Sequence, residues 1–239
     1  MGTIDFYLEV LIPALNKGFF LSVAIIVPSA TFGVLIGILV GAGRALGKGW
    51  LSRALDLYVT VFRGTPLVVQ LTVWYYGLPS ISLFLEAHFG EGVRPFSELF
   101  RLSPYVAAVV AFSMCSGAYQ SEYIRGALLS LKRGQYLAAL SLGFSKGRAF
   151  WFITVPMALR RAVPGCGNEI IYLIKYSSLA MLVTLSELMG EAKGVASLYF
   201  RYFECYMLVA LYYLAIVTVA TVLLHMLEKR LARPFATGH

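Results

Sequence analysis

Two acidic side chains, Glu122 and Glu169, lie within or beside stretches that are otherwise apolar, and a basic residue follows each of them. Arg125 comes after Glu122, and Lys175 comes after Glu169. A carboxylate inside a membrane segment is costly unless a cation pairs with it or water reaches it. Each acid therefore either joins helices through its basic neighbour or faces a cavity. In a cavity it could neutralise the ammonium group or the basic side chain of a solute.

Polar groups near two predicted helix breaks extend this cavity. Pro66 lacks a backbone donor and follows Gly64, while the segment 164–167 combines a proline with two glycines. Backbone that breaks at membrane depth is tolerated only where it lines a cavity or is buried in protein. Hydroxyl and amide groups beside such breaks could form hydrogen bonds with the carboxylate of a solute. The residues that we expect to contact a solute are Thr65, Gln70, Tyr119, Glu122, Asn168, Glu169 and Ser177.

The sequence offers no arrangement for covalent or metal chemistry. The segment 41–50 is only superficially like a phosphate loop, because Ala42 and Gly49 stand where a glycine and a hydroxyl residue are required. The histidines are scattered, and the cysteines have neither CxxC spacing nor neighbouring histidines. We therefore expect no catalytic residue, no metal ligand, no cofactor and no enzymatic activity in this chain.

Composition places these residues in a membrane. Hydrophobic residues make up 59% of the 239 positions and charged residues only 13%, with a mean hydropathy of +0.76; soluble domains carry about 25% charged residues. The net charge of +8 lies mostly on short loops, which indicates membrane topology and contact with anionic lipid rather than nucleic-acid binding. The apolar run that begins at residue 19 is too long for a cleaved signal peptide.

Long apolar segments predict an all-α integral membrane fold with about five transmembrane helices. The expected spans are 19–42, 57–78, 105–117 continuing to residue 122, a broken span after residue 164, and 206–227. Basic residues on the intervening loops place the N-terminus outside and the C-terminus in the cytoplasm. We expect one membrane domain, 1–239, with 80–103 as an external loop and 188–202 as a polar external connector.

Two further features of these spans are expected to act in packing. Gly33, Gly37 and Gly41 recur every four residues, which lets a neighbouring helix approach closely. Arg63 is too polar to face lipid. It either extends to the cytoplasmic interface or makes a functional contact.

The most informative segment is the basic loop at 118–164. A basic loop between spans is most often a topology signal alone. Within this one, however, 135–142 is an apolar, helix-compatible run that Gly143 closes. An apolar helix exposed to the cytosol requires a surface that covers it. The segment therefore predicts a docking helix for a soluble partner, within a cytoplasmic loop at about 128–160.

This loop resembles the EAA loop of bacterial ATP-binding-cassette (ABC) importer permeases, in which a short helix, a glycine and a later proline form a coupling element. The matching residues are Gly134, Gln135, Ala138, Ala139, Gly143 and Pro156. The segments 62–71, 118–127, 168–179 and 201–206 are similar to signatures of the polar amino-acid subgroup, the histidine, arginine and glutamine type. The resemblance therefore covers nearly the whole chain.

The resemblance implies a type I permease subunit in the bacterial inner membrane, paired with an identical or homologous permease. Two cytoplasmic ABC subunits would dock on the coupling helices and hydrolyse ATP, and an extracytoplasmic binding protein would deliver an amino acid. The implied coupling residues are Gly134, Gln135, Tyr136, Leu137, Ala138, Ala139, Leu140 and Gly143. Leu137 stands where the family usually has glutamate, which leaves docking to Tyr136, Leu140, Leu142 and the basic flanks.

Sequence reasoning thus favours an ATP-driven importer subunit for a polar amino acid, and the two acids favour a basic one such as arginine, ornithine or histidine. A motor-independent carrier or an ion channel is the first alternative, but it leaves the docking helix unexplained. A structural scaffold is the second alternative, in which the polar residues only join helices. A membrane-embedded enzyme ranks last.

Overall fold

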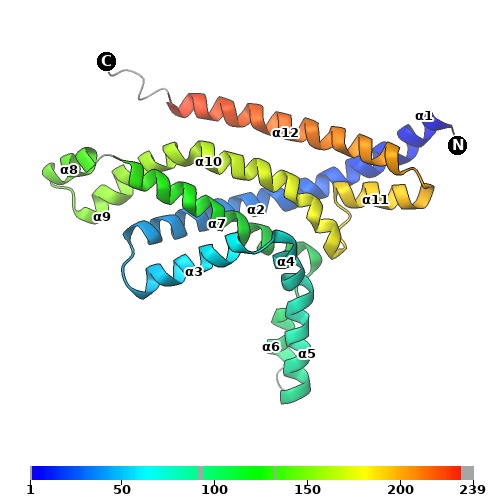
Figure 1. Cartoon of the computed structure of the whole chain (residues 1–239), viewed down its shortest axis with the longest axis horizontal. Coiled ribbons are helices and arrows are strands. Elements are labelled where there is room, and N and C mark those ends of the chain that lie inside the picture. Colours follow the sequence, from blue (N-terminus) through cyan, green and yellow to red (C-terminus); the bar gives the residue numbers. More distant parts are fainter. Residues whose placement is uncertain (1, 91–93, 132, 233–239) are drawn as a thin grey trace. The chain divides into compact units, whose positions relative to one another are not determined.

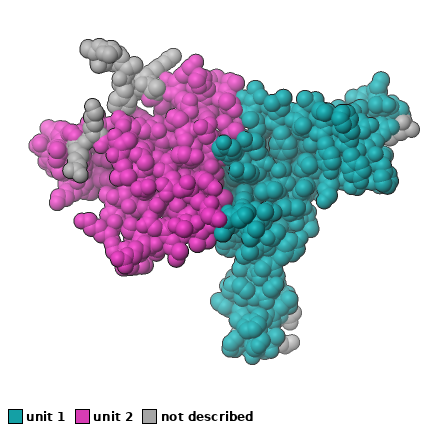
Figure 2. Space-filling view, in the orientation of Figure 1, with its two compact units in different colours: residues 1–31, 65–113, 172–218 teal, residues 32–64, 114–171, 219–239 magenta. Residues whose placement is uncertain are grey.

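A computed structural model describes residues 2–90, 94–131 and 133–232, and within these ranges the regular structure is helical, without a strand (Figure 1). The all-α prediction is confirmed. The chain divides into two compact units (Figure 2). Unit 1 comprises residues 1–31, 65–113 and 172–218, and unit 2 comprises 32–64, 114–171 and 219–239.

Three helical stretches of the described chain are long and apolar enough to cross a membrane: Thr3–Leu46, Leu67–Phe89 and Tyr202–Leu231. The bent pair Lys146–Val183 and Leu188–Tyr199, with an angle of 51°, forms a fourth if it is one span. Helix α7 (Pro104–Ser130) has 27 residues, or ~40 Å at ~1.5 Å per residue, which is enough to cross as well. Its buried serines and Gln120 make it less apolar than these stretches, and it meets the requirement by its length alone.

The second predicted span is misplaced, although the break predicted at Pro66 is confirmed. Helix α3 (Trp50–Gly64) ends before Pro66, and α4 (Leu67–Thr72) begins after it. The membrane-length stretch continues through Val73–Gly77 into α5 (Leu78–Phe89). Arg53 and Asp56 make α3 too polar for the core of a bilayer, so the apolar stretch lies after the break rather than across it.

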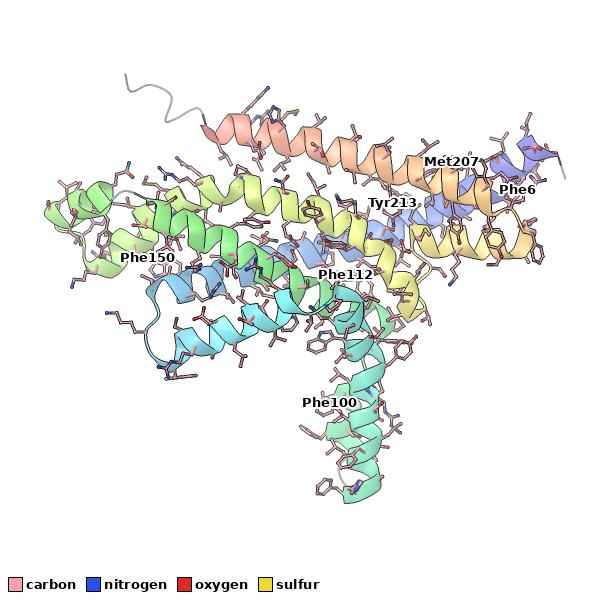
Figure 3. The ribbon with its side chains drawn as sticks, viewed as in Figure 1. Phe6, Phe100, Phe112, Phe150, Met207 and Tyr213 are labelled. Carbon is pink, nitrogen blue, oxygen red and sulfur yellow. The ribbon has the colours of Figure 1, made fainter. Side chains whose placement is uncertain are left out.

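Unit 1 has two buried clusters. One joins α2 (Ile12–Leu46), α11 (Leu188–Tyr199) and α12 (Tyr202–Ala232) through residues that include Leu15 and Leu188. The other surrounds Phe112, which Figure 3 labels on α7. The region predicted as a polar connector at 188–202 is thus mostly a helix with a buried face, because Leu188, Ala192 and Ala196 recur at helical spacing.

The region predicted as an external loop, 80–103, is also largely helical. Helix α5 extends to Phe89, and the short helices α6 (Arg94–Ser97) and Glu98–Phe100 follow the undescribed residues 91–93. The Arg101 guanidinium pairs with the Glu86 carboxylate at 3.0 Å, and the Ser97 hydroxyl donates a hydrogen bond to it at 2.5 Å. These contacts hold the returning chain against α5.

Unit 2 is built on a close approach between α2 and α7, as the glycine spacing predicts. A Cβ atom added at Gly37 would lie 2.7 Å from the Gln120 Cβ, and one at Gly41 would lie 2.8 Å from the Ser121 oxygen. The three-glycine face therefore lets α2 contact the buried polar face of α7. A third cluster, which includes Ile124 and Ala158, joins these helices to α10 (Val155–Tyr176).

The break predicted at 164–167 is wrong, because α10 runs through Pro164 without interruption. The adjacent glycines serve packing instead: a Cβ at Gly165 would lie 2.6 Å from the Tyr123 ring, and one at Gly167 would clash with Leu224. The helix changes further on, where a 3₁₀ segment covers Ser177–Val183 and Thr184 adopts φ 67°. A left-handed threonine is uncommon, and it ends this segment.

Candidate functional site

A cluster of charged side chains in unit 2 centres on Glu122 of α7. Its carboxylate pairs with three guanidinium groups: Arg44 at 2.7 Å, Arg125 at 3.2 Å and Arg63 at 3.3 Å. Arg44 also pairs with Asp56 at 2.6 Å. The Arg44 side chain is only 10% exposed and that of Glu122 is 23% exposed, so these pairs are partly shielded from solvent. The cluster fixes α2, the end of α3 and α7 to one another.

Sequence reasoning proposed Arg125 as a partner of Glu122, which the structure confirms, but it missed Arg44. Arg44 lies beyond the predicted span 19–42 but belongs to the last turns of α2. A usable signal was present, because Arg44 comes three residues after Gly41 and so continues the glycine face that packs on α7. Arg63, whose role was left open, contacts α7 rather than only extending to the interface.

Two other predicted site residues lie near Arg63. Its guanidinium carbon lies 5.2 Å from the centre of the Tyr119 ring, within the range of a cation–π contact. Glu169 of α10 is 5% exposed, lies next to the Ser116 hydroxyl of α7 and is within electrostatic reach of Arg63. Tyr119, Glu122 and Glu169 therefore gather around one arginine. Asn168, the neighbour of Glu169, is exposed.

The remaining predicted residues belong to unit 1. The Gln70 amide donates hydrogen bonds to the Thr65 carbonyl oxygen at 3.0 Å and to its hydroxyl at 2.9 Å. These bonds span the break at Pro66 and replace backbone pairing that the proline prevents. Ser177 is fully buried, and its hydroxyl donates to the Ile174 carbonyl at 2.7 Å, where α10 gives way to the 3₁₀ segment. Thr65 and Gln70 thus lie on either side of the break at Pro66, and Ser177 begins the 3₁₀ segment, so all three residues lie at irregular backbone.

Lys175, which we considered as a partner of Glu169, lies elsewhere. Its ammonium group is 4.3 Å from the centre of the Tyr172 ring on the preceding turn of α10. Lys175 and Glu169 are six residues apart on this helix, so they do not share a face. The carboxylate of Glu169 is therefore held near Ser116 and Arg63 rather than by the lysine that follows it.

The predicted docking helix is α8 (Arg133–Ser141), and it lies beside α9 (Lys146–Ala149) in unit 2 (Figure 1). Ala139 is buried on its inner side, with Tyr136 and Leu140 partly buried. Leu137 is 55% exposed and Leu142 is 79% exposed. The outward apolar surface is thus formed by Leu137 and Leu142 rather than by Tyr136 and Leu140.

The end of α8 is set by Gly143, which has φ +85°, and the surrounding space is open. Glycine is the residue that adopts this left-handed conformation without strain, as at many helix ends. The Phe144 amide returns to the Ala139 carbonyl at 3.1 Å, and the Ser145 hydroxyl caps α9. Phe150, labelled in Figure 3, then buries the returning chain in the core of unit 2. The short helix closed by Gly143, which the sequence predicts at 135–142, is present.

Comparison with known proteins agrees with this architecture. The chain is 36% identical over 221 residues to the glutamine transport system permease protein GlnP of Escherichia coli (strain K12), covering 92% of this chain and 94% of that protein. It is 31% identical over 220 residues to the arginine transport system permease protein ArtQ of Bacillus subtilis (strain 168), covering 92% and 93%.

Solved structures give the same result. A crystal structure of an amino acid ABC transporter with histidines superimposes with a TM-score of 0.79 at 26% identity, over 96% of this chain and 99% of that one. The methionine ABC transporter MetNI, at 18% identity and a TM-score of 0.67, shares the fold. The family model for the binding-protein-dependent transport system inner membrane component matches residues 33–233. The chain therefore belongs to this family, as a multi-pass inner-membrane permease subunit of an amino-acid ABC importer.

Proposed function

We propose that this permease forms part of the translocation path for a polar, basic amino acid and transmits the motion of a separate ATPase through α8. Its partners are two cytoplasmic ABC subunits, a second permease, identical or homologous, and an extracytoplasmic binding protein. The observation that carries the proposal is the exposed apolar surface of α8 beside a left-handed glycine. A soluble ATPase subunit that docks on α8 would cover these exposed apolar side chains.

The coupling step follows from the packing of the loop. Helix α8 contacts the segment Phe150–Thr154, and Phe150 belongs to the buried cluster of unit 2 that also contains Ile124 and Ala158. A force applied at Leu137 or Leu142 therefore reaches α7 and α10 through packed side chains. We propose that drawing the ATPases together moves α8 as a rigid body and changes the side to which the path opens.

Of the two acids, Glu169 is better suited than Glu122 to neutralise a cationic solute. The carboxylate of Glu122 already has three guanidinium partners. Glu169 has a hydroxyl neighbour and a more distant arginine. Buried charge attracts a cation more strongly than charge in water does, because the surrounding dielectric constant is lower. We keep Thr65, Gln70, Tyr119, Asn168 and Ser177 as proposed solute contacts.

The proposed coupling can be tested by ATP hydrolysis in proteoliposomes that contain the permease, its ATPase and partner permease, and a binding protein loaded with single amino acids. Hydrolysis should rise with one group of amino acids. Gly143→Val should reduce this stimulated rate about tenfold, because a left-handed non-glycine residue costs ~1–2 kcal/mol and a β-branched one more. Gly143→Asn should keep most of the rate, because asparagine tolerates this conformation.

Gly147→Val is the matched control, since Gly147 is also exposed with open space around it but lies in a right-handed helix. Coupling through α8 would be excluded if no loaded binding protein changed the rate of ATP hydrolysis and if Gly143→Val hydrolysed ATP at the wild-type rate. This result would favour the motor-independent carrier or channel.

Glu169→Gln should lower uptake of a cationic amino acid by about tenfold, the ~1.4 kcal/mol expected when a charged hydrogen-bond acceptor becomes neutral. Uptake of a neutral amino acid by the same complex should change much less. Initial uptake rates of radiolabelled arginine and glutamine give the comparison. An equal loss for both substrates would contradict charge pairing and leave Glu169 a packing role.

A further inference from the structure

A groove in unit 2, with a volume of about 420 Å³, lies between α8, the first turns of α10 and the end of α12. Apolar side chains, among them Met157, Val163 and Leu231, form much of its wall. Arg160, Arg161 and Glu228 also line it. The groove therefore combines an apolar surface with charged groups, which is the pattern of a site for an amphipathic molecule.

The position of the groove along α12 sets its depth in the membrane. The membrane-length stretch of this helix ends at Leu231, and the basic residues Lys229 and Arg230 lie in its last turn. Because the C-terminus of this architecture is cytoplasmic, the end of α12 lies at the level of the lipid headgroups on that side. The apolar wall of the groove thus lies at the depth of the acyl chains in the membrane.

Of the charged side chains that line the groove, Arg160 is the one whose guanidinium group is available to bind a ligand. Arg161 donates to the Ser130 carbonyl at 3.0 Å and to its hydroxyl at 3.2 Å, which anchors it to the end of α7. Glu228 lies 3.6 Å from the Nδ1 atom of His225. Arg160 is exposed and has neither a hydrogen bond nor an ion pair to any residue that the structure describes. The lining of the groove thus contains two guanidinium groups but one carboxylate, and that carboxylate already contacts His225.

From this geometry, we propose that the groove binds an anionic phospholipid of the cytoplasmic leaflet, of the phosphatidylglycerol class. Its phosphodiester would lie between Arg160 and Arg161, whose planar guanidinium groups match phosphate oxygens in paired hydrogen bonds. An acyl chain would cover Met157, Val163 and Leu231. The excess of positive charge favours an anionic headgroup over a zwitterionic one, and basic pockets between helices on the cytoplasmic side are suited to such lipids.

A lipid in this groove would also contact the coupling element. Gln135 of α8 lines the same groove as the two arginines of α10. The bound lipid would therefore connect α8 to α10 and α12 and limit the movement of α8 relative to them. We expect the content of anionic lipid to set how efficiently ATP hydrolysis is coupled to the membrane helices.

Native mass spectrometry of the assembled complex, purified from nanodiscs of phosphatidylglycerol mixed with phosphatidylcholine or phosphatidylethanolamine, tests the binding. Wild type should retain phosphatidylglycerol selectively. Arg160→Gln should retain it about fivefold less, the equivalent of ~1 kcal/mol for one interfacial arginine. Arg230→Gln removes the same charge from α12 outside the groove and should retain it as wild type does. Equal retention by wild type and Arg160→Gln, or retention of all three lipids alike, would overturn the proposal.

Two further measurements separate this site from other uses of the arginines. Glycerol phosphate added in solution should not displace the lipid, and efficient displacement would identify a site for a soluble phosphate compound instead. The stimulated ATPase rate should rise with the phosphatidylglycerol fraction in wild type and respond less in Arg160→Gln. A loss in the variant that is the same at every lipid composition would assign Arg160 to the ATPase contact and reject the lipid.

Discussion

Replacing Glu122 with leucine should destabilise the permease by about 2–3 kcal/mol and abolish uptake of every substrate. Three guanidinium groups would lose their shared carboxylate. Removing one member of a buried ion pair costs ~3–5 kcal/mol. We expect the smaller loss of about 2–3 kcal/mol here, because Arg63 and Arg125 are partly exposed to solvent. The midpoint of thermal unfolding of the purified complex should fall by roughly 4–12 °C, at ~2–4 °C per kcal/mol.

Asp56→Leu is the matched control for this change. It removes a carboxylate from the same cluster, but the Asp56 side chain is 52% exposed and, among the residues that the structure describes, forms an ion pair with Arg44 alone. An exposed ion pair contributes ~0–1 kcal/mol, so Asp56→Leu should leave the thermal midpoint nearly unchanged. Equal effects of the two substitutions would show that the charges around Glu122 are not coupled as the geometry indicates.

A further variant, Glu122→Gln, distinguishes a structural role of Glu122 from contact with the solute. If it holds helices together, Glu122→Gln should lower the thermal midpoint and reduce uptake of cationic and neutral amino acids alike. If it contacts the solute, Glu122→Gln should keep the midpoint and reduce uptake of the cationic amino acid alone. The three short arginine contacts favour the first result.

The parts of this fold that follow from local rules could be predicted from the sequence. Gly33, Gly37 and Gly41 predict a closely packed helix pair, Pro66 predicts a break, and Gly143 predicts the end of a helix. Each prediction rests on what one or two residue types permit for the backbone. The structure has all three features where they are expected.

The features that were missed depend on contacts between distant segments. Arg44 and Glu122 are 78 residues apart, and no spacing rule relates them. Pro164 and its neighbouring glycines predict a break, yet the packing of Gly165 on Tyr123 keeps α10 continuous. Tertiary packing thus outweighs the local preference of these residues. The outward face of α8 could not be assigned either, because its hydrophobic residues surround the helix rather than following one side.

Glu187→Leu should have the largest effect on the stability of unit 1. Glu187 precedes α11 and is fully buried. Its carboxylate accepts four hydrogen bonds: from the Met189 and Gly190 amides at 3.0 and 2.9 Å, and from the Ser22 and Tyr213 hydroxyls at 3.3 and 3.1 Å. A buried donor without an acceptor costs ~1–3 kcal/mol, so the loss should reach about 3–5 kcal/mol even if the hydroxyls find other partners.

This carboxylate cannot be replaced by water, because the chain is closely packed around it. A Cβ atom added at Gly18 would lie 2.9 Å from the Glu187 carbonyl, so α2 approaches the start of α11 with no space between them. The Leu188 amide also donates to the Ser22 hydroxyl at 3.1 Å, which links the same two helices a second time. Losing Glu187 should therefore release α11 from α2 and α12 together, rather than fray one helix end.

Glu191→Leu supplies the comparison within the same helix, since Glu191 pairs at 3.1 Å with Lys17, whose side chain is 80% exposed. It should cost less than ~1 kcal/mol. Glu187→Gln should be intermediate, because the amide keeps one acceptor oxygen but turns a donor toward the other groups. Thermal unfolding of the complex, with protease resistance in membranes for variants too unstable to purify, should rank them as Glu191→Leu, Glu187→Gln, Glu187→Leu in order of increasing damage. If Glu187→Leu were as stable as Glu191→Leu, the hydrogen bonds at the start of α11 would be incidental, and the hydrophobic cluster around Leu188 would suffice to hold this helix.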